Sequence, residues 1–213
     1  ANIGEASAHG VDIQVEYRKN WNKDLWTSAR GNFTFARSKY EVYEEPTYAE
    51  SYRQHVGYSI KQTWGYIAER LFIDDEEAAN SPSQAAFGSQ YGGGDIKYTD
   101  VNGDGIINEA DMVPIGNPTS PEFIYGFGFS VGYKGFDCSV FFQGLANESF
   151  WINASGYSKN NPGGMHPFYQ NTQLLQSIAD DHWSEDNRNI YAFWPRLSTY
   201  LNNNNTPVST WWM

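Results

Sequence analysis

The chain is poor in charged residues, poorer still in basic ones, and has a single cysteine. Charged residues make up 18% of its 213 positions, against about 25% in an average globular protein. With 14 Lys and Arg against 25 Asp and Glu, the net charge is -11. This balance excludes a nucleic-acid partner, because binding phosphates requires clustered basic residues. Cys138 cannot form an internal disulfide and lies in an apolar pattern, so redox chemistry is not expected.

No stretch of the chain approaches the roughly 18 consecutive apolar residues that a transmembrane helix requires. The first residues also have neither the basic nor the apolar region of a signal peptide, so none is expected. Transmembrane β-strands escape the first test, because their outward apolar side chains alternate with polar inward ones. Helical membrane proteins are therefore excluded, whereas membrane β-proteins are not.

Aromatic residues and glycine are abundant: 17% of the chain is aromatic, with 8 Trp, 15 Tyr and 13 Phe, and there are 20 Gly. Aromatic side chains favour strands and glycine favours the turns between them. Strict alternation over residues 9–18, followed by a turn near 20–24, predicts an antiparallel hairpin over residues 9–37. Its second strand has one face made of Leu25, Thr27, Ala29, Gly31, Phe33 and Phe35.

A second hairpin is predicted over residues 123–144. The odd positions of its first strand are all large and apolar, namely Phe123, Tyr125, Phe127, Phe129, Val131 and Tyr133. Most even positions are small, namely Gly126, Gly128, Ser130 and Gly132. A two-residue turn at Lys134 and Gly135 would pair Tyr133 with Phe136 and set Phe141 across from Gly128. The hairpin therefore has one apolar face and one face of small and polar residues.

Lipid and the core of a soluble sandwich explain such an apolar face equally well on pattern alone. The connections favour lipid, because the turns at one end are short while the segments at the other end, 38–122 and 145–213, are very long. Outer-membrane barrels show this asymmetry. A short helix is expected near residues 74–80, within the first long segment. We expect an all-β fold: antiparallel strands of a partial transmembrane barrel with long extracellular loops.

Several segments resemble, in order, the late barrel region of the SusC/RagA type of TonB-dependent outer-membrane transporters. The longest are DIKYTDVNGDGIIN at 95–108, IGNPTSPEFIYGFGFS at 115–130 and YKGFD at 133–137. Shorter ones are NIGE at 2–5, GVD at 10–12, GYIA at 65–68 and WPRLS at 194–198. Together they span nearly the whole chain.

The resemblance implies a transmembrane β-barrel in the outer membrane of a Gram-negative cell, with its long loops extracellular and lipid around it. It also implies three partners: TonB acting through an N-terminal plug, a SusD-like lipoprotein, and a glycan or peptide cargo. The plug, the TonB-contacting segment and the final strands have no counterpart in this sequence. The whole chain, 1–213, is therefore expected to be part of such a barrel, and the transport function to belong to the larger protein.

The strongest chemical motif is a 12-residue loop at 100–111 that resembles the calcium loop of an EF-hand. Calcium prefers six to eight oxygen ligands, supplied by positions 1, 3, 5, 7, 9 and 12 around a glycine at position 6. Here these positions are Asp100, Asn102, Asp104, Ile106, Asn108 and Asp111. The flanking helices of an EF-hand are not predicted, so a structural Ca²⁺ competes with an Asx-rich turn without an ion.

No catalytic residues are predicted. Ser130 fits the G-x-S-x-G pattern, but it lies in mid-strand rather than in the strained turn that a nucleophile requires. Four aromatic residues in the long segments could stack on sugar rings or on the lipoprotein, or could simply pack the loops together: Trp151, Tyr157, Trp183 and Trp194. The main alternative for the whole chain is a secreted, calcium-stabilised β-sandwich that binds glycans.

Overall fold

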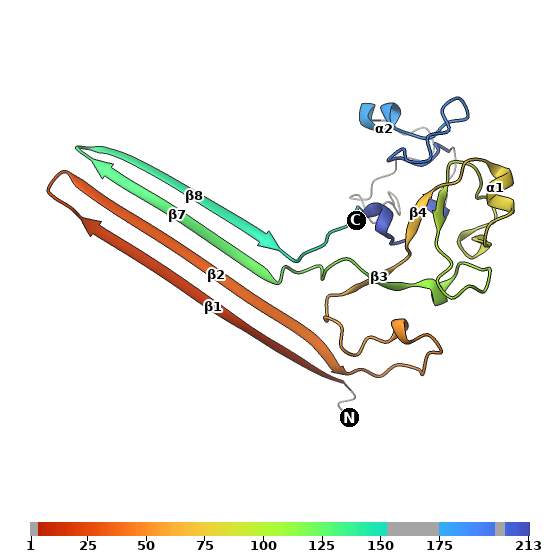
Figure 1. The fold of residues 1–213 in the computed structure, drawn as a ribbon, viewed down its shortest axis with the longest axis horizontal. Coiled ribbons are helices and arrows are strands. Elements are labelled where there is room, and N and C mark those ends of the chain that lie inside the picture. The colour runs from red at the N-terminus through yellow and green to blue at the C-terminus, as the bar shows by residue number, and fades with distance from the viewer. Residues whose placement is uncertain (1–3, 153–174, 199–202) are drawn as a thin grey trace, which may run out of the picture. The chain divides into compact units, whose positions relative to one another are not determined.

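The computed structural model describes residues 4–152, 175–198 and 203–213, which form an all-β fold of antiparallel sheets with short helical turns (Figure 1). This confirms the all-β class and the antiparallel pairing expected from the alternating pattern, whereas the expected barrel stays a prediction. The chain divides into two compact units. Unit 1 comprises residues 1–46, 55–62 and 117–149, and unit 2 comprises 47–54, 63–116 and 150–213. Within the described part of the chain, no helix has the length and apolarity needed to cross a membrane.

Unit 1 is a sheet of four long strands in the order β1-β2-β7-β8 (Figure 1). The strands are β1 (Glu5–Asn20), β2 (Leu25–Val42), β7 (Phe123–Tyr133) and β8 (Phe136–Ala146). Strands β1 and β2 form the first predicted hairpin, and β7 and β8 form the second. Antiparallel pairing of β2 with β7, from Leu25 opposite Tyr133 to Phe35 opposite Phe123, joins the two hairpins into one sheet.

The register of the second hairpin is the predicted one, with Tyr133 opposite Phe136 and Gly128 opposite Phe141. Its turn residues Lys134 and Gly135 have φ values of 46° and 86°. Two central residues with positive φ match the twist of the flanking strands. The backbone N–H of Lys134 donates to the carbonyl of Asp24 at 2.9 Å, so the two short turns lie side by side.

The first hairpin is longer than predicted, because it extends beyond residues 9–37 to Glu5 at one end and to Val42 at the other. Apolar alternation fades after Phe35, but the backbone ladder does not depend on it. Polar side chains support the added length: Ser7 donates to Glu41 at 2.7 Å, and Lys39 pairs with Glu41 at 3.0 Å. The first residues of the two segments expected as loops, 38–122 and 145–213, therefore belong to β2 and β8.

Unit 2 is built of short elements rather than long strands. Two pairs of strands are antiparallel, β3 (Thr63–Gly65) with β6 (Val113–Ile115) and β4 (Ala68–Leu71) with β5 (Ile96–Tyr98). The helix expected near 74–80 is α1 (Asp75–Ala79), capped by Asp74, which accepts from the N–H of Glu77 at 2.9 Å. The other helical segments are α2 (Gln176–Asp180), η1 (Ser51–Arg53), η2 (Ala85–Phe87), η3 (Glu109–Asp111), η4 (Asn203–Asn205) and η5 (Thr210–Trp212).

The hydrophobic core of unit 2 is assembled from segments far apart in the sequence. Its buried members are Tyr66, Leu71, Ile96, Tyr98, Ile107, Ile178, Trp183, Ala192, Trp194 and Trp212. The indole of Trp194 lies 5.8 Å from that of Trp212, and Tyr66 lies 5.5 Å from Tyr98, both measured between ring centroids. Burying these large rings stabilises a unit that has little regular secondary structure.

Amide side chains form the hydrogen bonds with the backbone of β5 that a further neighbouring strand would otherwise form. Gln84 accepts from the N–H of Tyr98 at 2.8 Å, Asn205 accepts from the N–H of Ile96 at 2.9 Å, and Asn204 donates to the carbonyl of Ile96 at 2.9 Å. Beside them, the fully buried carboxylate of Asp95 pairs with Arg196 at 2.7 Å. Unpartnered buried backbone groups would each be costly, so these side chains are structural.

Replacing Gly128 with alanine is expected to destabilise the sheet of unit 1. A Cβ at this position would lie 2.7 Å from Cδ2 of Phe141 and 2.9 Å from the carbonyl oxygen of Val140. Overpacking of this kind lowers the free energy of unfolding by about 1–2 kcal/mol. In the control Gly31→Ala, the new Cβ meets only a carbonyl oxygen at 3.7 Å, and the stability should rise by about 0.5 kcal/mol. Equal denaturant midpoints for the two variants would contradict this packing.

The ion pair between Arg70 and Glu77 is expected to make unit 2 acid-sensitive. Hydrogen bonds from Arg70 lower the pKa of Glu77 from 4.5 to about 2, with Lys97 assisting. Because the folded pKa is the lower one, this contribution is complete above about pH 4.5 and is lost as the pH falls through 2. Glu77→Gln should lower the thermal midpoint at pH 7 and flatten its acid dependence. Glu76→Gln, an exposed neighbour, should do neither, and parallel acid profiles of Glu77→Gln and wild type would refute the assignment.

Candidate functional site

One face of the unit 1 sheet is apolar along all four strands. Period-two alternation gathers on this face Val11, Ile13, Val15 and Tyr17 of β1, Phe33 and Phe35 of β2, the odd positions of β7, and Phe136, Cys138, Val140 and Phe142 of β8. Aromatic pairs hold neighbouring strands together, such as Phe127 and Phe142, whose rings stack at 5.2 Å. Most of these side chains are strongly exposed, with Val15 at 61% and Phe127 at 55%. The face is therefore large, continuous and uncovered by other residues of unit 1.

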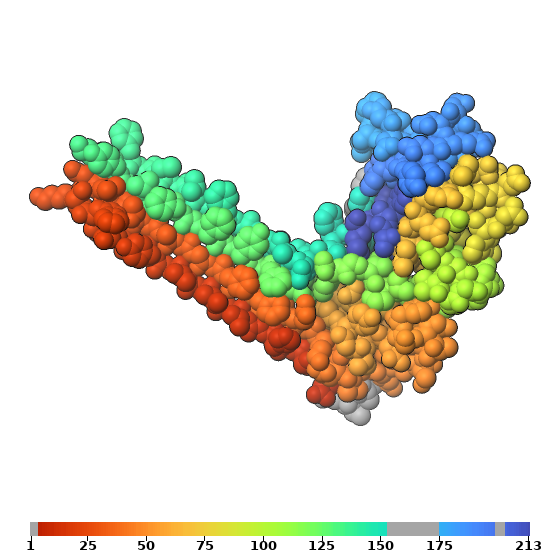
Figure 2. Space-filling model, viewed as in Figure 1, coloured from red at the N-terminus to blue at the C-terminus, as the bar shows by residue number. Residues whose placement is uncertain are grey.

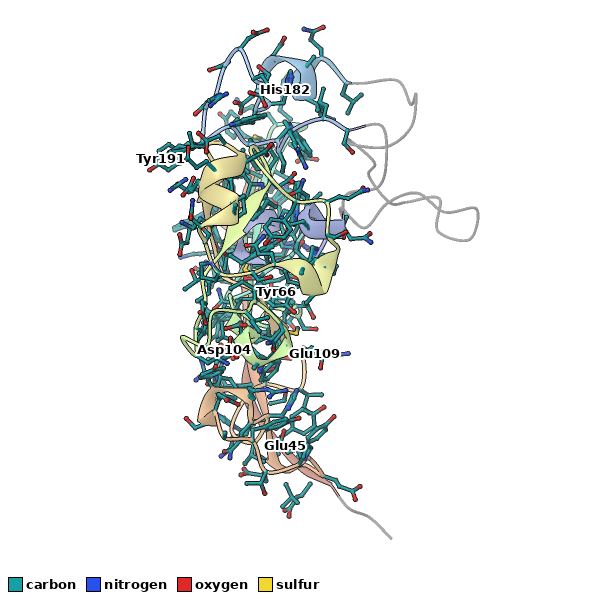
Figure 3. The ribbon with its side chains drawn as sticks, turned by 90° about the vertical axis from the view of Figure 1, so that its right-hand side faces the viewer. Glu45, Tyr66, Asp104, Glu109, His182 and Tyr191 are labelled. Atoms are coloured by element: carbon teal, nitrogen blue, oxygen red, sulfur yellow. The ribbon has the colours of Figure 1, made fainter. Side chains whose placement is uncertain are left out.

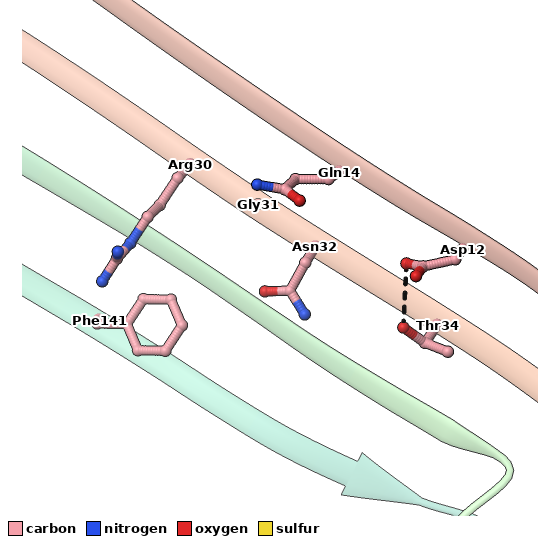
Figure 4. Close-up of a pocket in the computed structure, with 7 residues that line it drawn as sticks. All are labelled: Asp12, Gln14, Arg30, Gly31, Asn32, Thr34 and Phe141. Atoms are coloured by element: carbon pink, nitrogen blue, oxygen red, sulfur yellow. Dashed lines mark hydrogen bonds between the residues drawn. The ribbon is translucent and has the colours of Figure 1, made fainter.

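The opposite face carries polar side chains over a floor of glycine and serine. A hollow of about 550 Å³ is lined by Asp12 and Gln14 of β1, Asn32 and Thr34 of β2, and Phe141 of β8. Figure 4 shows these side chains. The hydroxyl of Thr34 donates to Asp12 at 3.2 Å. On the same face, Ser139 and Ser130 are hydrogen-bonded at 2.8 Å.

Arg30 is the cation that lines this hollow. Its guanidinium lies 4.6 Å from the centroid of the Phe141 ring (Figure 4), a cation–π contact that orients the charge without neutralising it. The backbone register sets Arg30 opposite Gly128, and the missing side chain there leaves room for the ring. Figure 2 shows the four strands side by side as one continuous band. Because side chains alternate between the two faces in this register, the sheet separates an apolar surface from a polar one.

The strand ends away from the short turns carry a tight ion pair. Arg37 donates to both carboxylate oxygens of Glu122, at 2.7 and 2.8 Å, and Asn147 donates to the same carboxylate at 3.1 Å. These bonds, chiefly that from Arg37, lower the pKa of Glu122. Glu122 is nearly buried, so the pair fixes the point where β7 begins beside β2.

The loop at 100–111 has the turns of an EF-like loop, and its oxygens are occupied by backbone amides. Asp100 accepts from the N–H groups of Gly103 and Gly105 at 2.7 and 2.8 Å. Asp111 is fully buried and accepts from Val101 and Asn108, both at 2.8 Å. Gly105, at the sixth position, has the positive φ of 82° that the sharp turn requires. Within the described residues, no three acidic, His or Cys side chains converge as a metal cluster.

The remaining ligand positions of this loop face outward or cap it. Asp104 accepts from the N–H of Ile106 at 2.8 Å, and Asn108 caps η3 by accepting from the N–H of Ala110 at 2.7 Å. Figure 3 labels Asp104 and Glu109, which lie on this loop, and Tyr66, which lies outside it. Burial, with the charges of Glu109 and Asp111, raises the pKa of Tyr66 to about 12. The loop is thus anchored to the core of unit 2 while its tip stays exposed.

Of the four aromatic residues proposed for sugar or partner contact, the three that the structure describes do not form one surface. Trp183 and Trp194 are 3% and 8% exposed and belong to the core of unit 2, so neither presents a ring face to a ligand. Trp151 is half-buried. Tyr157 lies outside the described residues. For Trp183 and Trp194, the packing alternative is the one that the structure shows.

Two features escaped the sequence analysis. The contact between Arg30 and Phe141 joins residues in separate hairpins, which only the pairing of β2 with β7 brings together. Asn204 and Asn205 lie in a run of asparagines that looks like an exposed turn, yet both are buried. No local signal distinguishes a buried asparagine from an exposed one, because its partners lie about a hundred residues away.

Two curated relatives come from Formosa agariphila. The chain is 30% identical over 159 residues to "TonB-dependent receptor P3", a match that covers 67% of this chain and 15% of the relative. It is 49% identical over 97 residues to "TonB-dependent receptor P26", covering 44% of this chain and 9% of the relative. The chain thus spans less than a fifth of the length of either relative. No protein-family model matches it.

Solved structures with the same fold come from a peptide transporter. "Structure of the RagAB peptide transporter" superposes with a TM-score of 0.60 at 17% identity, covering 95% of this chain and 21% of that one. The "open-open" state of the RagAB peptide importer gives a TM-score of 0.56 at 14% identity, covering 96% and 21%. The identity to the first relative over two thirds of this chain shows that the chain belongs to the TonB-dependent receptors, and the RagAB structures share its fold.

Proposed function

We propose that the chain is part of the wall of an outer-membrane β-barrel in a transporter that imports oligosaccharides or peptides. In this proposal the apolar face of unit 1 contacts lipid, the polar face lines the interior, and unit 2 belongs to the long extracellular loops. Energy from TonB would act through the plug of the whole protein. A SusD-like lipoprotein would deliver the cargo, as a partner of the same larger assembly.

The two-faced sheet is the observation that carries this proposal. Between β1 and β2, the first polar pairs at the two ends of the apolar face are Lys19 with Thr27 and His9 with Arg37. Strand β2 advances about 3.3 Å per residue from Thr27 to Arg37. With a tilt of about 40° from the membrane normal, this stretch spans roughly 25 Å, which is the height of the apolar band of a membrane barrel. Strand β7, with 11 residues, also has the length of a membrane-spanning strand.

The alternative of a soluble, glycan-binding sandwich is less well supported. A sandwich buries its apolar face beneath a second sheet, whereas here Ile13 and Phe129 are both about half exposed. In water such a face would drive aggregation. The outer strands β1 and β8 also leave one edge each to pair with further strands, as a barrel requires.

The class of cargo is proposed from the descriptions of the relatives and from the chemistry of the polar face. The solved neighbours are described as a peptide transporter, while the curated relatives are named only as receptors. Arg30, Asp12 and Glu16 give the polar face both signs of charge beside amides and hydroxyls, which suits peptides and oligosaccharides alike. None of these named relatives is an enzyme, and we propose no catalytic role.

We also propose a structural calcium ion at the tip of the loop 100–111. Asp100, Asn102 and Asp104 are the ligands best placed for it, because they flank the two positive-φ glycines at the exposed tip. Carboxylate oxygens that accept one amide hydrogen keep a lone pair for a cation. The contribution of Asp111 would be the smallest, since its side chain is fully buried and one of its oxygens accepts from two backbone amides, those of Val101 and Asn102.

The membrane position can be tested by cysteine accessibility in the full-length protein, with Cys138 replaced by serine. Cysteines at Ile13 and Phe129, on the apolar face, should react with a charged maleimide at least about tenfold more slowly than cysteines at Gln14 and Ser130. The physical reason is that a charged group at the bilayer centre costs about 2.5 kcal/mol or more. Equal rates on the two faces in intact membranes would rule out the lipid contact.

Uptake of labelled peptides and oligosaccharides, with and without TonB, would then separate the cargo classes.

Calcium binding can be tested by calorimetry on the full-length protein. Titration should give a saturable signal with a dissociation constant of about 10⁻³ M or tighter, and Asp100→Asn with Asp104→Asn should abolish it. The matched control, Asp180→Asn with Asp186→Asn, removes two exposed carboxylates outside the loop and should leave the signal unchanged. Wild-type protein that gives no heat at millimolar calcium would exclude the ion.

A further inference from the structure

The two short turns of unit 1 carry a group of lysines at the border of the apolar face. We name as the lysine rim the residues Lys19, Trp21, Lys23, Tyr133 and Lys134. All five are exposed. They lie close together, because Lys134 N–H is hydrogen-bonded to the carbonyl of Asp24 and Leu25 pairs with Tyr133.

The first lysine projects on the apolar side of the sheet. Lys19 follows Tyr17 at period two, so both lie on the apolar face. The indole of Trp21 is fastened to the same side by a hydrogen bond from Nε1 to the hydroxyl of Thr27 at 2.9 Å. The ammonium of Lys19 lies 3.9 Å from the centroid of this indole, which directs the charge along the sheet surface.

The second aromatic contact repeats this arrangement on the neighbouring turn. The ammonium of Lys134 lies 5.3 Å from the centroid of Tyr133, and Tyr133 ends the apolar face of β7. Lys134 has a positive φ, at a position where glycine or asparagine is normally favoured. Each turn therefore combines an aromatic ring at the end of the apolar band with an ammonium beside it.

No described residue forms an ion pair with a lysine of the rim. Within the described residues, none of the three ammonium groups forms an ion pair, and the nearby Asp137 lies opposite Gly132 on the polar face. The other end of the apolar face differs, because there Arg37 is paired with Glu122 and Lys39 with Glu41. Along the described strands of the sheet, positive charge is thus left available at the short-turn end.

We propose that the lysine rim binds the phosphate groups of anionic phospholipids at the edge of the membrane. The occupant is a lipid headgroup because the charges border an apolar face of bilayer height, and because the rings of Trp21 and Tyr133 have the amphipathic character found at membrane interfaces. Lysine stems can lie along the apolar surface while their ammonium groups reach the phosphates. This inference rests on the proposed membrane position, and it adds a lipid preference and a location for it.

Spin-labelled lipids can measure this preference in the full-length protein reconstituted into bilayers. Wild-type protein should immobilise labelled phosphatidylglycerol in preference to phosphatidylcholine. The triple variant Lys19→Gln, Lys23→Gln and Lys134→Gln should lose at least about fivefold of this preference, since one lysine near an anionic surface contributes about 1 kcal/mol. The matched control Lys39→Gln, Lys61→Gln and Arg188→Gln removes the same charge outside the rim and should retain the wild-type preference.

The possible results distinguish a wrong assignment of lipid binding to the lysine rim from a wrong membrane position of unit 1. If the triple variant keeps the preference, or the control loses it equally, the lysine rim is not a lipid site, although immobilised lipid would still support the barrel wall. If wild-type protein immobilises neither lipid, the membrane position itself is wrong. Heat-modifiable migration in electrophoresis verifies that each variant is folded before the comparison.

Discussion

The pairing of β2 with β7 is the interaction on which the rest of unit 1 depends. It joins two hairpins that are separated by some eighty residues, through eleven consecutive residue pairs. Because side chains alternate between the faces of a sheet, a shift by one residue would turn the aromatic set of one hairpin toward the polar set of the other. The observed register aligns them, so one apolar surface and one polar surface extend over four strands.

Glycine and aromatic side chains adapt to this register. Gly128 leaves the space over which Phe141 lies, and Phe141 in turn supports the guanidinium of Arg30. Trp26 covers Gly132 in the same way near the short turns. The polar face is therefore a layer in which rings from one strand occupy the space above glycines of the next, with the hollow near Asp12 and Asn32 left between them.

Unit 2 differs, because its described residues form only short strands, and side chains complete the hydrogen bonding of their backbone. Asn204, Asn205 and Gln84 replace the missing strand beside β5, and the ion pairs of Asp95 with Arg196 and of Glu77 with Arg70 connect segments that have few strand contacts. Such networks are favourable only when every member has a partner. Trp183, Trp194 and Trp212 supply the apolar burial around them.

The sequence by itself determined the all-β class, the register of the second hairpin and the composition of the two faces, because period-two alternation and a two-residue turn are local properties. It also pointed to the family through its motifs. Only the tertiary structure decided that β2 pairs with β7, that the first hairpin extends to Val42, and that Trp183, Trp194 and Asn205 are buried. These features rest on partners distant in the sequence, from Ser7 for Glu41 to Ile96 for Asn205, and the polarity of a side chain does not show whether such a partner satisfies it.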